Sequence, residues 1–550
     1  MEVSTERGTS EPISAVAVLA CAWPALLLAA ACLLPFLDKP FNIDDPYFLM
    51  MAQQIVRHPA HPMDFSICWN AGPGDECRKG YEFASGNAMR GQVAQGYVLA
   101  PTVLAGAREW VAHLTQLVLA WIAIVAMTSL VLRFGWGRGH AIAGALLLVA
   151  VPPFLPMAST AMPDILATAL ALVAMERLAA WKQEHKWNQG AAAAIALSLA
   201  GFARPHLVLL LPLAAFFLME STNPKEVLTQ IRRKLWLWIP VFAGFGLLLV
   251  IALALREHTL SLSPAKVGLH WKLPLFLHNL LAFLLYFAFP IPLAACWLAN
   301  RLRARRLISV AIPFAVATLP WLFGWYQPLG ISLAIIGCSV LINLLWDALN
   351  RRDHTGIFLL LWLLIPLPIV FYAQLPMKYL LPCIPAAILL CFRLTDGMSL
   401  RFARAAAIVL IAASAAYSIL ILRSDAEFAE FGRDALYRLI SPHVAAGERV
   451  WFPGQYWSYW YAPMAGATLT FPDGPQPSRG DLLVVDLLTD GDLAPLARFP
   501  HRTLVESVSH KYGFGRTMGA GVGLYDSGRG YWLWGFGESE KDRFEIWRID

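Results

Sequence analysis

The sequence predicts a polytopic α-helical membrane protein that carries a small α/β domain at its C-terminal end. Of the 550 residues, 58% are hydrophobic and only 15% are charged, whereas a soluble globular chain carries about 25% charged residues. Apolar segments long enough to cross a bilayer, about 20 residues each, follow one another as far as residue 422. The last part of the chain is polar and contains strand-like runs. These observations exclude an ordinary soluble enzyme.

About thirteen segments are predicted to span the membrane, some of them short. They cover residues 14–37, 109–132, 140–156, 164–181, 189–202, 204–219, 236–255, 273–299, 307–325, 329–349, 356–373, 379–394 and 405–422. The first is interpreted as a retained span, because it has no convincing small-residue cleavage site of the kind that ends a signal peptide.

The positions of Lys and Arg predict the orientation in the membrane. With the N-terminus taken as cytoplasmic, most basic residues fall in inside loops, for example Arg301, Arg303, Arg305 and Arg306. An excess of Lys and Arg marks the cytoplasmic side. The net charge of +6 is therefore a topology signal and does not indicate a nucleic-acid partner. An odd number of spans places the C-terminal region outside the cytoplasm.

Two large pieces are expected outside. The transmembrane domain covers residues 1–423 and includes a first outside loop at about 38–108, and residues 424–550 form the α/β domain. In that domain we expect an opening helix over 425–439 and strands at 449–452 and 482–486, with turns at 472–474 and 527–530. The aromatic run 456–461 could stack on sugars, although a domain core or a membrane-surface anchor is the favoured interpretation.

The first outside loop also holds Cys68 and Cys77, which could pair as a disulfide if their compartment is oxidising. The chain has no Asn-x-Ser/Thr sequon. This absence favours a bacterial inner membrane over an endoplasmic reticulum membrane.

Two adjacent carboxylates, Asp44 and Asp45, stand where the first span ends and the outside loop begins. Proline is favoured at the first position of a helix and Asp is a good N-cap, so the Asp45–Pro46 pair predicts a helix on the membrane surface with Asp45 as its cap. Asp44 has no such local role. Both acids could simply solvate a loop, but a pair at a membrane boundary favours a function.

Three further ionisable residues belong to the same predicted outside face. Asp164 follows a proline at the start of an apolar helix, where it could merely complement the helix dipole. Arg204 and Lys378 lie at the ends of apolar spans and could snorkel to lipid headgroups. They could equally hold an anionic phosphate, and Lys79 and Arg90 of the first loop are weaker candidates for that role.

No metal centre is predicted. His58 and His61 could bind a metal, but the prolines that follow them favour a rigid turn. The sequence contains no HExxH motif, no glycine-rich phosphate loop and no convincing Ser nucleophile elbow. The sequence does not firmly imply any cofactor. A divalent cation is the cofactor whose presence the sequence leaves undecided.

Four stretches together resemble the GT-C superfamily of integral-membrane glycosyltransferases. They are Ile43–Tyr47, Ala161–Asp164, Ala203–Pro205 and Lys378–Ala386, within a match over about residues 14–422. The likeness is closest to the branch of the protein O-mannosyltransferases and the aminoarabinose transferases of lipid A. Each motif is short, and their order and sidedness carry the resemblance.

The resemblance implies an inverting transfer of a sugar from a polyprenyl-phosphate donor to a glycan, lipid or protein acceptor. It implies Asp44 as the base, with Asp45 beside it and Asp164 as the second carboxylate, and Arg204 and Lys378 as ligands of the lipid phosphate. The acidic pair departs from the family pattern, which is often Asp-Glu. The expected partners are the donor, the acceptor and membrane lipids.

Two other function classes compete with this hypothesis. A transporter or flippase of a lipid-linked sugar would more often show repeated halves and charges at mid-span, and the sequence shows neither. A non-catalytic envelope scaffold that presents the tail would not explain the acids.

Overall fold

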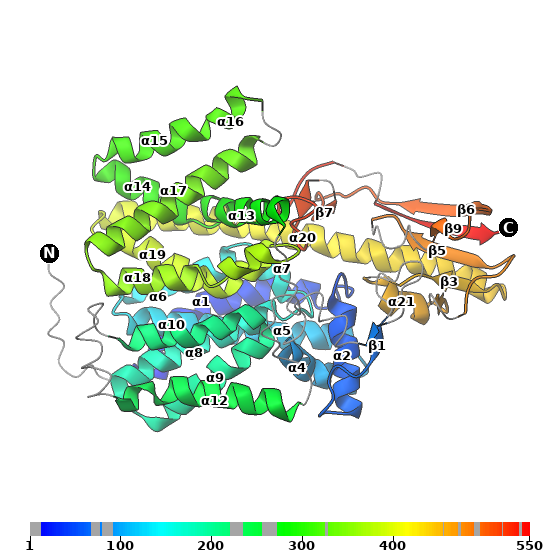
Figure 1. Ribbon diagram of the computed structural model, residues 1–550, viewed down its shortest axis with the longest axis horizontal. Coiled ribbons are helices and arrows are strands. Elements are labelled where there is room, and N and C mark those ends of the chain that lie inside the picture. Colours follow the sequence, from blue (N-terminus) through cyan, green and yellow to red (C-terminus); the bar gives the residue numbers. More distant parts are fainter. Residues whose placement is uncertain are drawn as a thin grey trace.

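The computed structural model describes residues 13–67, 78–79, 92–219, 235–255, 272–324, 328–454, 456–470, 475–488, 496–519, 521–537 and 542–550. A bundle of apolar helices forms one end of the molecule and a mixed sheet forms the other (Figure 1). One long helix, α20, connects the two ends.

The helices of the bundle follow one another along most of the chain. Up to residue 254 they are α1 (Ala15–Leu33), η1 (Leu34–Phe36), α2 (Asp45–Arg57), α4 (Val93–Leu104), α5 (Glu109–Arg133), α6 (Arg138–Ala150), α7 (Phe154–Ala158), α8 (Asp164–Glu184), α9 (Trp187–Ala203), η2 (Pro205–Leu209), α10 (Leu210–Leu218), η3 (Leu235–Trp238) and α12 (Ile239–Ala254). They continue with α13 (Leu273–Ala288), α14 (Leu293–Arg303), α15 (Leu307–Ala317), α16 (Leu319–Leu322), α17 (Pro328–Asn350), α18 (His354–Leu363), η4 (Leu367–Phe371), η5 (Met377–Cys383), α19 (Ile384–Thr395) and α20 (Leu400–Ala445).

The predicted class, a polytopic α-helical membrane protein, is confirmed. Among the described residues, seven helices are long and apolar enough to cross a membrane, and the bent pair α13–α14 makes an eighth. This number is smaller than the thirteen predicted spans, because several of the predicted segments form shorter apolar helices, among them Arg138–Ala150, Pro205–Leu218 and Leu307–Leu322. The predicted span 273–299 bends by 58° between its two helices. Pro290 and Pro292 lie at this bend, and proline cannot continue a helix ladder.

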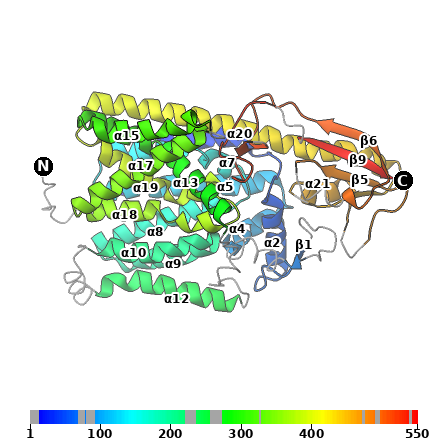
Figure 2. The same ribbon diagram turned by 45° about the horizontal axis from the view of Figure 1, so that its top comes forward.

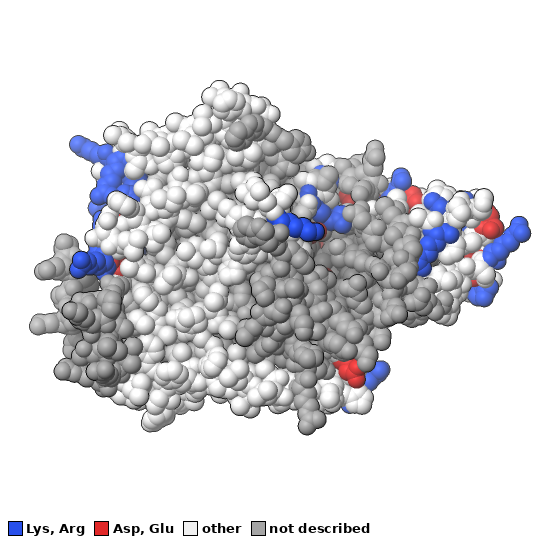
Figure 3. All heavy atoms as spheres, in the orientation of Figure 1, with Lys and Arg blue, Asp and Glu red and all other residues white. Residues whose placement is uncertain are grey.

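The surface of the bundle is that of an integral membrane protein. Large apolar side chains point outward from its helices, such as Phe242 at 62%, Leu253 at 76% and Ile408 at 67% exposure. Soluble proteins rarely expose contiguous apolar surface on this scale. Figure 3 shows a broad band without charge along the bundle, with Lys and Arg gathered at the end remote from the sheet. That end agrees with the cytoplasmic side that the loop charges predict.

Helix α20 extends well beyond the bundle. Its 46 residues give a length of about 69 Å at 1.5 Å per residue, more than twice the roughly 30 Å hydrocarbon thickness of a bilayer. The helix runs without a break through residues 423–424, where the sequence predicts a domain boundary. The predicted opening helix over 425–439 is thus the second part of α20, which carries the sheet away from the bundle (Figure 2).

The C-terminal sheet has five strands in the order β4-β3-β5-β9-β6. They are β3 (Val450–Phe452), β4 (Thr468–Leu469), β5 (Leu482–Asp486), β6 (Arg502–Ser509) and β9 (Arg543–Ile549). Strand β3 pairs in parallel with β4 and β5, and β9 pairs antiparallel with β5 and β6. Strands β3 and β5 are the two that the sequence predicts. The remaining strands form two-stranded pairs, β1 (Ser66–Ile67) with β2 (Arg78–Lys79) and β7 (Met518–Gly519) with β8 (Val522–Gly523).

The aromatic run beside β3 contributes to the core of this domain. Helix α21 (Ser458–Met464) packs on α20, and the buried ring of Trp457 lies 4.7 Å from that of Phe428. Tyr461 is also buried, and its hydroxyl accepts a hydrogen bond from Phe41 N and donates one to Glu109, each at 2.8 Å. The run therefore joins the sheet domain to the bundle.

A second connection is made by a fully buried ion pair. Lys39 follows the first span and pairs with Asp425 of α20, and both side chains are 0% exposed. Lys39 also donates to the carbonyl and hydroxyl of Ser159, at 3.1 and 3.2 Å. Asp425 accepts a further hydrogen bond from the hydroxyl of Tyr525 at 2.7 Å. Four segments far apart in the sequence are thus held at one point.

We predict that Lys39→Met destabilises the protein by about 3–5 kcal/mol, because it leaves the Asp425 carboxylate buried without its cation. Adding Asp425→Asn should recover part of this loss, since the amide is neutral and still accepts a hydrogen bond. Unfolding of detergent-solubilised protein by denaturant measures both effects. Arg433→Met is the matched control, because Arg433 pairs with an Asp434 side chain that is 67% exposed, and such surface pairs contribute about 0–1 kcal/mol. Equal losses in both variants would contradict the prediction.

Candidate functional site

The two acids at the start of α2 have different surroundings, and the structure corrects the predicted cap. Helix α2 begins at Asp45, and Asp44 occupies the N-cap position without a side-chain capping bond. The carboxylate of Asp45 instead accepts hydrogen bonds from Asn42 N at 3.0 Å and from Ala161 N at 2.8 Å. The capping prediction for Asp45 is therefore wrong. Its side chain ties the first loop to the segment before α8, a contact that only the tertiary fold creates.

Asp45 is fully buried, and this burial raises its pKa to about 7. The nearby Lys39 and the two backbone N–H donors act in the opposite direction. Both of its oxygens are already used in holding the loop. Asp45 therefore holds in place the loop that carries Asp44.

Asp44 is the more accessible acid, with 22% of its side chain exposed. Its Oδ2 lies 3.7 Å from Nζ of Lys378, whose side chain is 2% exposed. Burial raises the pKa of Asp44 above its usual range, and the charges of Lys378 and Arg204 partly oppose that rise. A carboxylate with a raised pKa is a better proton acceptor than an ordinary surface aspartate.

Asp164 and Arg204 form a tighter pair beside it. Asp164 is the first residue of α8 and Arg204 is the C-cap of α9. Nη2 of Arg204 donates to Oδ1 of Asp164 at 2.6 Å, and Nη1 donates to the side-chain oxygen of Gln92 at 3.2 Å. Both charged side chains are nearly excluded from solvent, at 7% and 1% exposure. The arrangement compensates two charges that the fold buries together.

Aromatic rings connect the two cations. The helical turn η5 carries Lys378 and Tyr379, and the ring of Tyr379 lies 4.6 Å from Cζ of Arg204 and 5.7 Å from Nζ of Lys378. The ring of Tyr525, from the C-terminal domain, lies 5.2 Å from the same ammonium group. Cations over aromatic faces at these distances are attracted by the ring quadrupole. Lys378 is thus held among apolar rings and close to one carboxylate oxygen.

The structure gathers Asp44, Asp45, Asp164, Arg204 and Lys378 into one region. Lys79 lies in β2, where its backbone pairs with Ser66 of β1, and its side chain is outside the described part. Arg90, Cys68 and Cys77 also lie outside the described residues, so their predicted roles stay predictions. No three His, Cys, Asp or Glu side chains of the described ranges gather into a metal-binding group, and the divalent cation stays a prediction too.

Sequence reasoning missed Lys39, Asp425 and Tyr525. A lysine directly after the first span and close to the acid pair was a signal for Lys39. Asp425 lies in what the sequence presents as a surface helix, and Tyr525 lies in a turn-rich stretch. Neither residue lies in a local sequence pattern that indicates the site. Both come close to it only because the C-terminal domain folds back onto the bundle.

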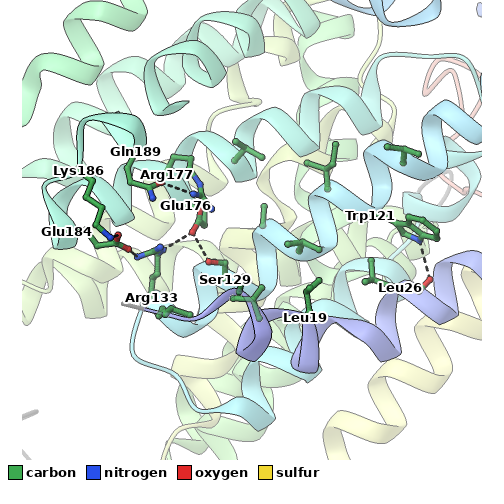
Figure 4. A pocket seen from close by; sticks show the side chains of 18 residues that line it. Leu19, Leu26, Trp121, Ser129, Arg133, Glu176, Arg177, Glu184, Lys186 and Gln189 are labelled. Atoms are coloured by element: carbon green, nitrogen blue, oxygen red, sulfur yellow. Dashed lines mark hydrogen bonds and ion pairs between the residues drawn. The ribbon is translucent and has the colours of Figure 1, made fainter. Parts of the chain in front are cut away.

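A cavity of about 880 Å³ lies elsewhere in the bundle, among residues of α1, α5 and α8 (Figure 4). Its charged end is self-compensated, since Glu176 accepts hydrogen bonds from Ser129 at 2.6 Å and from Arg133 at 2.7 Å. It shares no lining residue with the acids and cations described above. Because the charges at this cavity are already paired, the candidate site is the Asp44 region.

Comparison with known proteins gives structural likeness only. No family model and no curated protein sequence matches the chain. ArnT from Cupriavidus metallidurans bound to undecaprenyl phosphate has a TM-score of 0.46 and 14% identity, with 90% of this chain and 97% of that chain covered. The oligosaccharyltransferase of Archaeoglobus fulgidus, tethered to an acceptor peptide, has a TM-score of 0.45 and 13% identity, with 88% and 72% covered.

The arabinosyltransferase EmbB from Mycobacterium smegmatis has a TM-score of 0.37 and 15% identity, and the match covers 81% of this chain and 44% of that one. All three are membrane glycosyltransferases of the GT-C superfamily, the family that the sequence motifs resemble. Since each TM-score is below 0.5, none of these likenesses decides the function of this chain, and the geometry of its own site has to carry that assignment.

We predict that the two ion pairs of the site contribute differently to stability. Arg204→Gln should cost about 3–5 kcal/mol, because it leaves the buried Asp164 without a cation, and Arg204→Gln/Asp164→Asn should cost less. Lys378→Gln should cost about 1 kcal/mol or less, because its partner Asp44 is partly solvated and 3.7 Å away. Denaturant unfolding in detergent compares the three variants. A larger loss in Lys378→Gln than in Arg204→Gln would contradict this assignment.

Proposed function

We propose that the protein is a glycosyltransferase that moves a sugar from a polyprenyl-phosphate donor to an acceptor hydroxyl. The observation that carries this proposal is the placement of a partly exposed carboxylate, Asp44, within 3.7 Å of a lysine ammonium group, Lys378. A base beside a cation, at the end of an apolar bundle, suits a substrate with a phosphate, a sugar and a long apolar tail.

The reaction needs two protein groups at the reacting atoms. The sugar is already bonded to phosphate, which is a good leaving group, so no general acid is required. The oxygen of the acceptor hydroxyl attacks C1 of the sugar, and Asp44 takes the proton of that hydroxyl. The bond from C1 to the phosphate oxygen breaks, and Lys378 stabilises the charge that the departing polyprenyl phosphate gains. Direct attack from the opposite face inverts the configuration at C1.

Lys378 is the cation best suited to the phosphate. Its contact with Asp44 is longer than a hydrogen bond, whereas Arg204 is committed to Asp164 at 2.6 Å. A phosphate oxygen can therefore approach Lys378 without breaking a short ion pair. Arg204 acts on Asp44 at longer range, where its charge lowers the pKa of that carboxyl. We assign Asp164 and Asp45 to positioning within the same site.

We place this reaction on the extracytoplasmic face of a bacterial inner membrane. The clustering of Lys and Arg at the end of the bundle remote from the sheet supports this orientation (Figure 3). The C-terminal domain, residues 424–550, then lies outside the cytoplasm next to the Asp44 region. The acceptor is a hydroxyl-bearing glycan, lipid or protein.

We expect Asp44→Asn to lower the rate of sugar transfer by about 10²–10⁴-fold, the usual contribution of a positioned base. The assay uses undecaprenyl-phosphate sugars as donors and cell-envelope extract as the source of acceptor. The matched control is Asp64→Asn, since Asp64 is an exposed acid of the same loop. Transfer by Asp44→Asn at the wild-type rate, in protein with wild-type stability, would remove Asp44 as the base.

The pH dependence of kcat/KM should reflect the ionisation of Asp44. Because the base acts only when ionised, kcat/KM falls as pH drops through the raised pKa of Asp44, so the acid limb should lie above the ordinary Asp value of 3.8. Lys378 lowers this pKa, and Lys378→Gln should therefore move the acid limb to higher pH. Lys272→Gln, at an exposed lysine, should leave the limb unchanged. A limb that moves to lower pH in Lys378→Gln would contradict the assignment.

A further inference from the structure

The C-terminal domain sends one short loop, Gly523–Gly530, onto the bundle beside the candidate site. Oγ of Ser527 accepts a hydrogen bond from Leu375 N at 2.8 Å, and its carbonyl accepts one from Nε2 of His278 at 2.8 Å. Nδ1 of His278 then accepts from the hydroxyl of Tyr531 at 2.9 Å. With the bond from Tyr525 to Asp425, the loop is held by α13, by the segment before η5 and by α20.

Close backbone approach makes this loop rigid as well as anchored. A Cβ atom at Gly523 would lie 2.0 Å from the carbonyl oxygen of Asp526, and one at Gly530 would lie 2.0 Å from the carbonyl carbon of Gly521. No side chain fits at either position without moving the backbone. The loop is therefore closed on itself and presents its intervening side chains in fixed places.

One of those side chains, Tyr525, lies against a proposed reacting group. The ring of Tyr525 lies 5.2 Å from Nζ of Lys378, which is itself 3.7 Å from Asp44. Asp526 follows directly, and its charge adds to the effect of burial in raising the pKa of Asp44. The loop thus adds the charge of Asp526 to the carboxylates that surround the proposed base.

Asp526 and Arg529 form a loose, accessible pair. Nε of Arg529 lies 3.8 Å from Oδ2 of Asp526, and the side chains are 19% and 31% exposed. Oδ1 of Asp526 accepts from Gly528 N at 2.8 Å, which fixes the carboxylate and leaves Oδ2 without a short bond. Nε of Arg529 is buried without a hydrogen-bond partner in the described part of the chain. Since both side chains are partly exposed, the pair offers a carboxylate acceptor and a guanidinium donor to a ligand.

We propose that Asp526 and Arg529 form the sugar subsite of the donor, where the carboxylate accepts from one ring hydroxyl and the guanidinium donates to a neighbouring oxygen. The inference rests on the proposed function: the ring of Tyr525 lies 5.2 Å from Nζ of Lys378, so the loop borders the place where that proposal puts the donor phosphate. The pair is neutral overall. It therefore favours an uncharged sugar with adjacent hydroxyl groups over an amino sugar or a uronic acid.

The test separates the sugar from its lipid carrier. Affinities are measured by native mass spectrometry for undecaprenyl phosphate and for its mannose, glucose and aminoarabinose conjugates. The variants are Asp526→Asn and Arg529→Gln. Asn retains the oxygen that accepts from Gly528 N, so the loop is expected to stay folded. Asp434→Asn is the matched control, since Asp434 belongs to an exposed pair of α20.

We expect both variants to weaken the binding of mannose or glucose conjugates by roughly 10–100-fold, the loss of one hydrogen bond to a charged group, and to leave bare undecaprenyl phosphate within twofold. In transfer assays the same change should appear mainly in KM. Equal weakening of bare and sugar-bearing lipids, or no change in either, would overturn the sugar subsite.

The outcomes also separate this inference from the proposed function. In one outcome, the wild-type protein transfers no sugar but binds sugar-bearing lipids more tightly than the bare lipid, and Asp526→Asn loses this preference. That result supports the sugar subsite and contradicts the transferase proposal. In the other outcome, the wild-type protein transfers sugar and both variants do so with unchanged kinetics. That result supports the transferase proposal and contradicts the sugar subsite. If Asp526→Asn does not fold, the Arg529→Gln and Arg529→Lys pair decides, because Lys retains the charge and should recover part of the affinity.

Discussion

The buried ion pair between Lys39 and Asp425 is the interaction on which the geometry of the site depends. Neither side chain is exposed to solvent, so each charge is stable there only because the other is present. Lys39 belongs to the end of the first span, and Asp425 belongs to the part of α20 that leaves the bundle. Their contact fixes the short loop that carries Asp44 and Asp45 between two rigid helices. It also fixes the C-terminal domain, because Tyr525 donates its hydroxyl hydrogen to the same carboxylate.

The site is therefore assembled from segments of the chain that each compensate a buried charge. Asp45 ties the first loop to Ala161, Arg204 neutralises Asp164, and Tyr379 lies against both cations. These contacts compensate charges that the apolar bundle would otherwise destabilise. The exception is the contact between Lys378 and Asp44, which is long and partly solvated. Because Arg204 and Asp164 are already held in a short ion pair, the looser pair of Lys378 and Asp44 is better suited to meet a substrate, and it is there that we place the chemistry.

The C-terminal domain has a different relation to the bundle from the one its sequence suggests. Its polar composition and turn signals indicate a separate unit, whereas α20 crosses the predicted boundary without a break. The loop Gly523–Gly530 then returns to the bundle and places Tyr525 over Lys378. The C-terminal domain thus contributes a side chain to the same region as Asp44 and Lys378.

Hydropathy, alternation and motif order are local properties of the chain, and from them the sequence predicts the membrane class, the strands β3 and β5 and five ionisable residues that the fold gathers in one region. The number of spans does not follow from the sequence, since several apolar segments form helices of fewer than 18 residues. The tertiary structure decided the role of Asp45, whose hydrogen-bond donor at Ala161 is 116 residues away. It also decided that Lys39, Asp425 and Tyr525 belong to the site. Their contacts depend on which segments lie together in the folded protein, and neither periodicity nor residue spacing in the sequence predicts that.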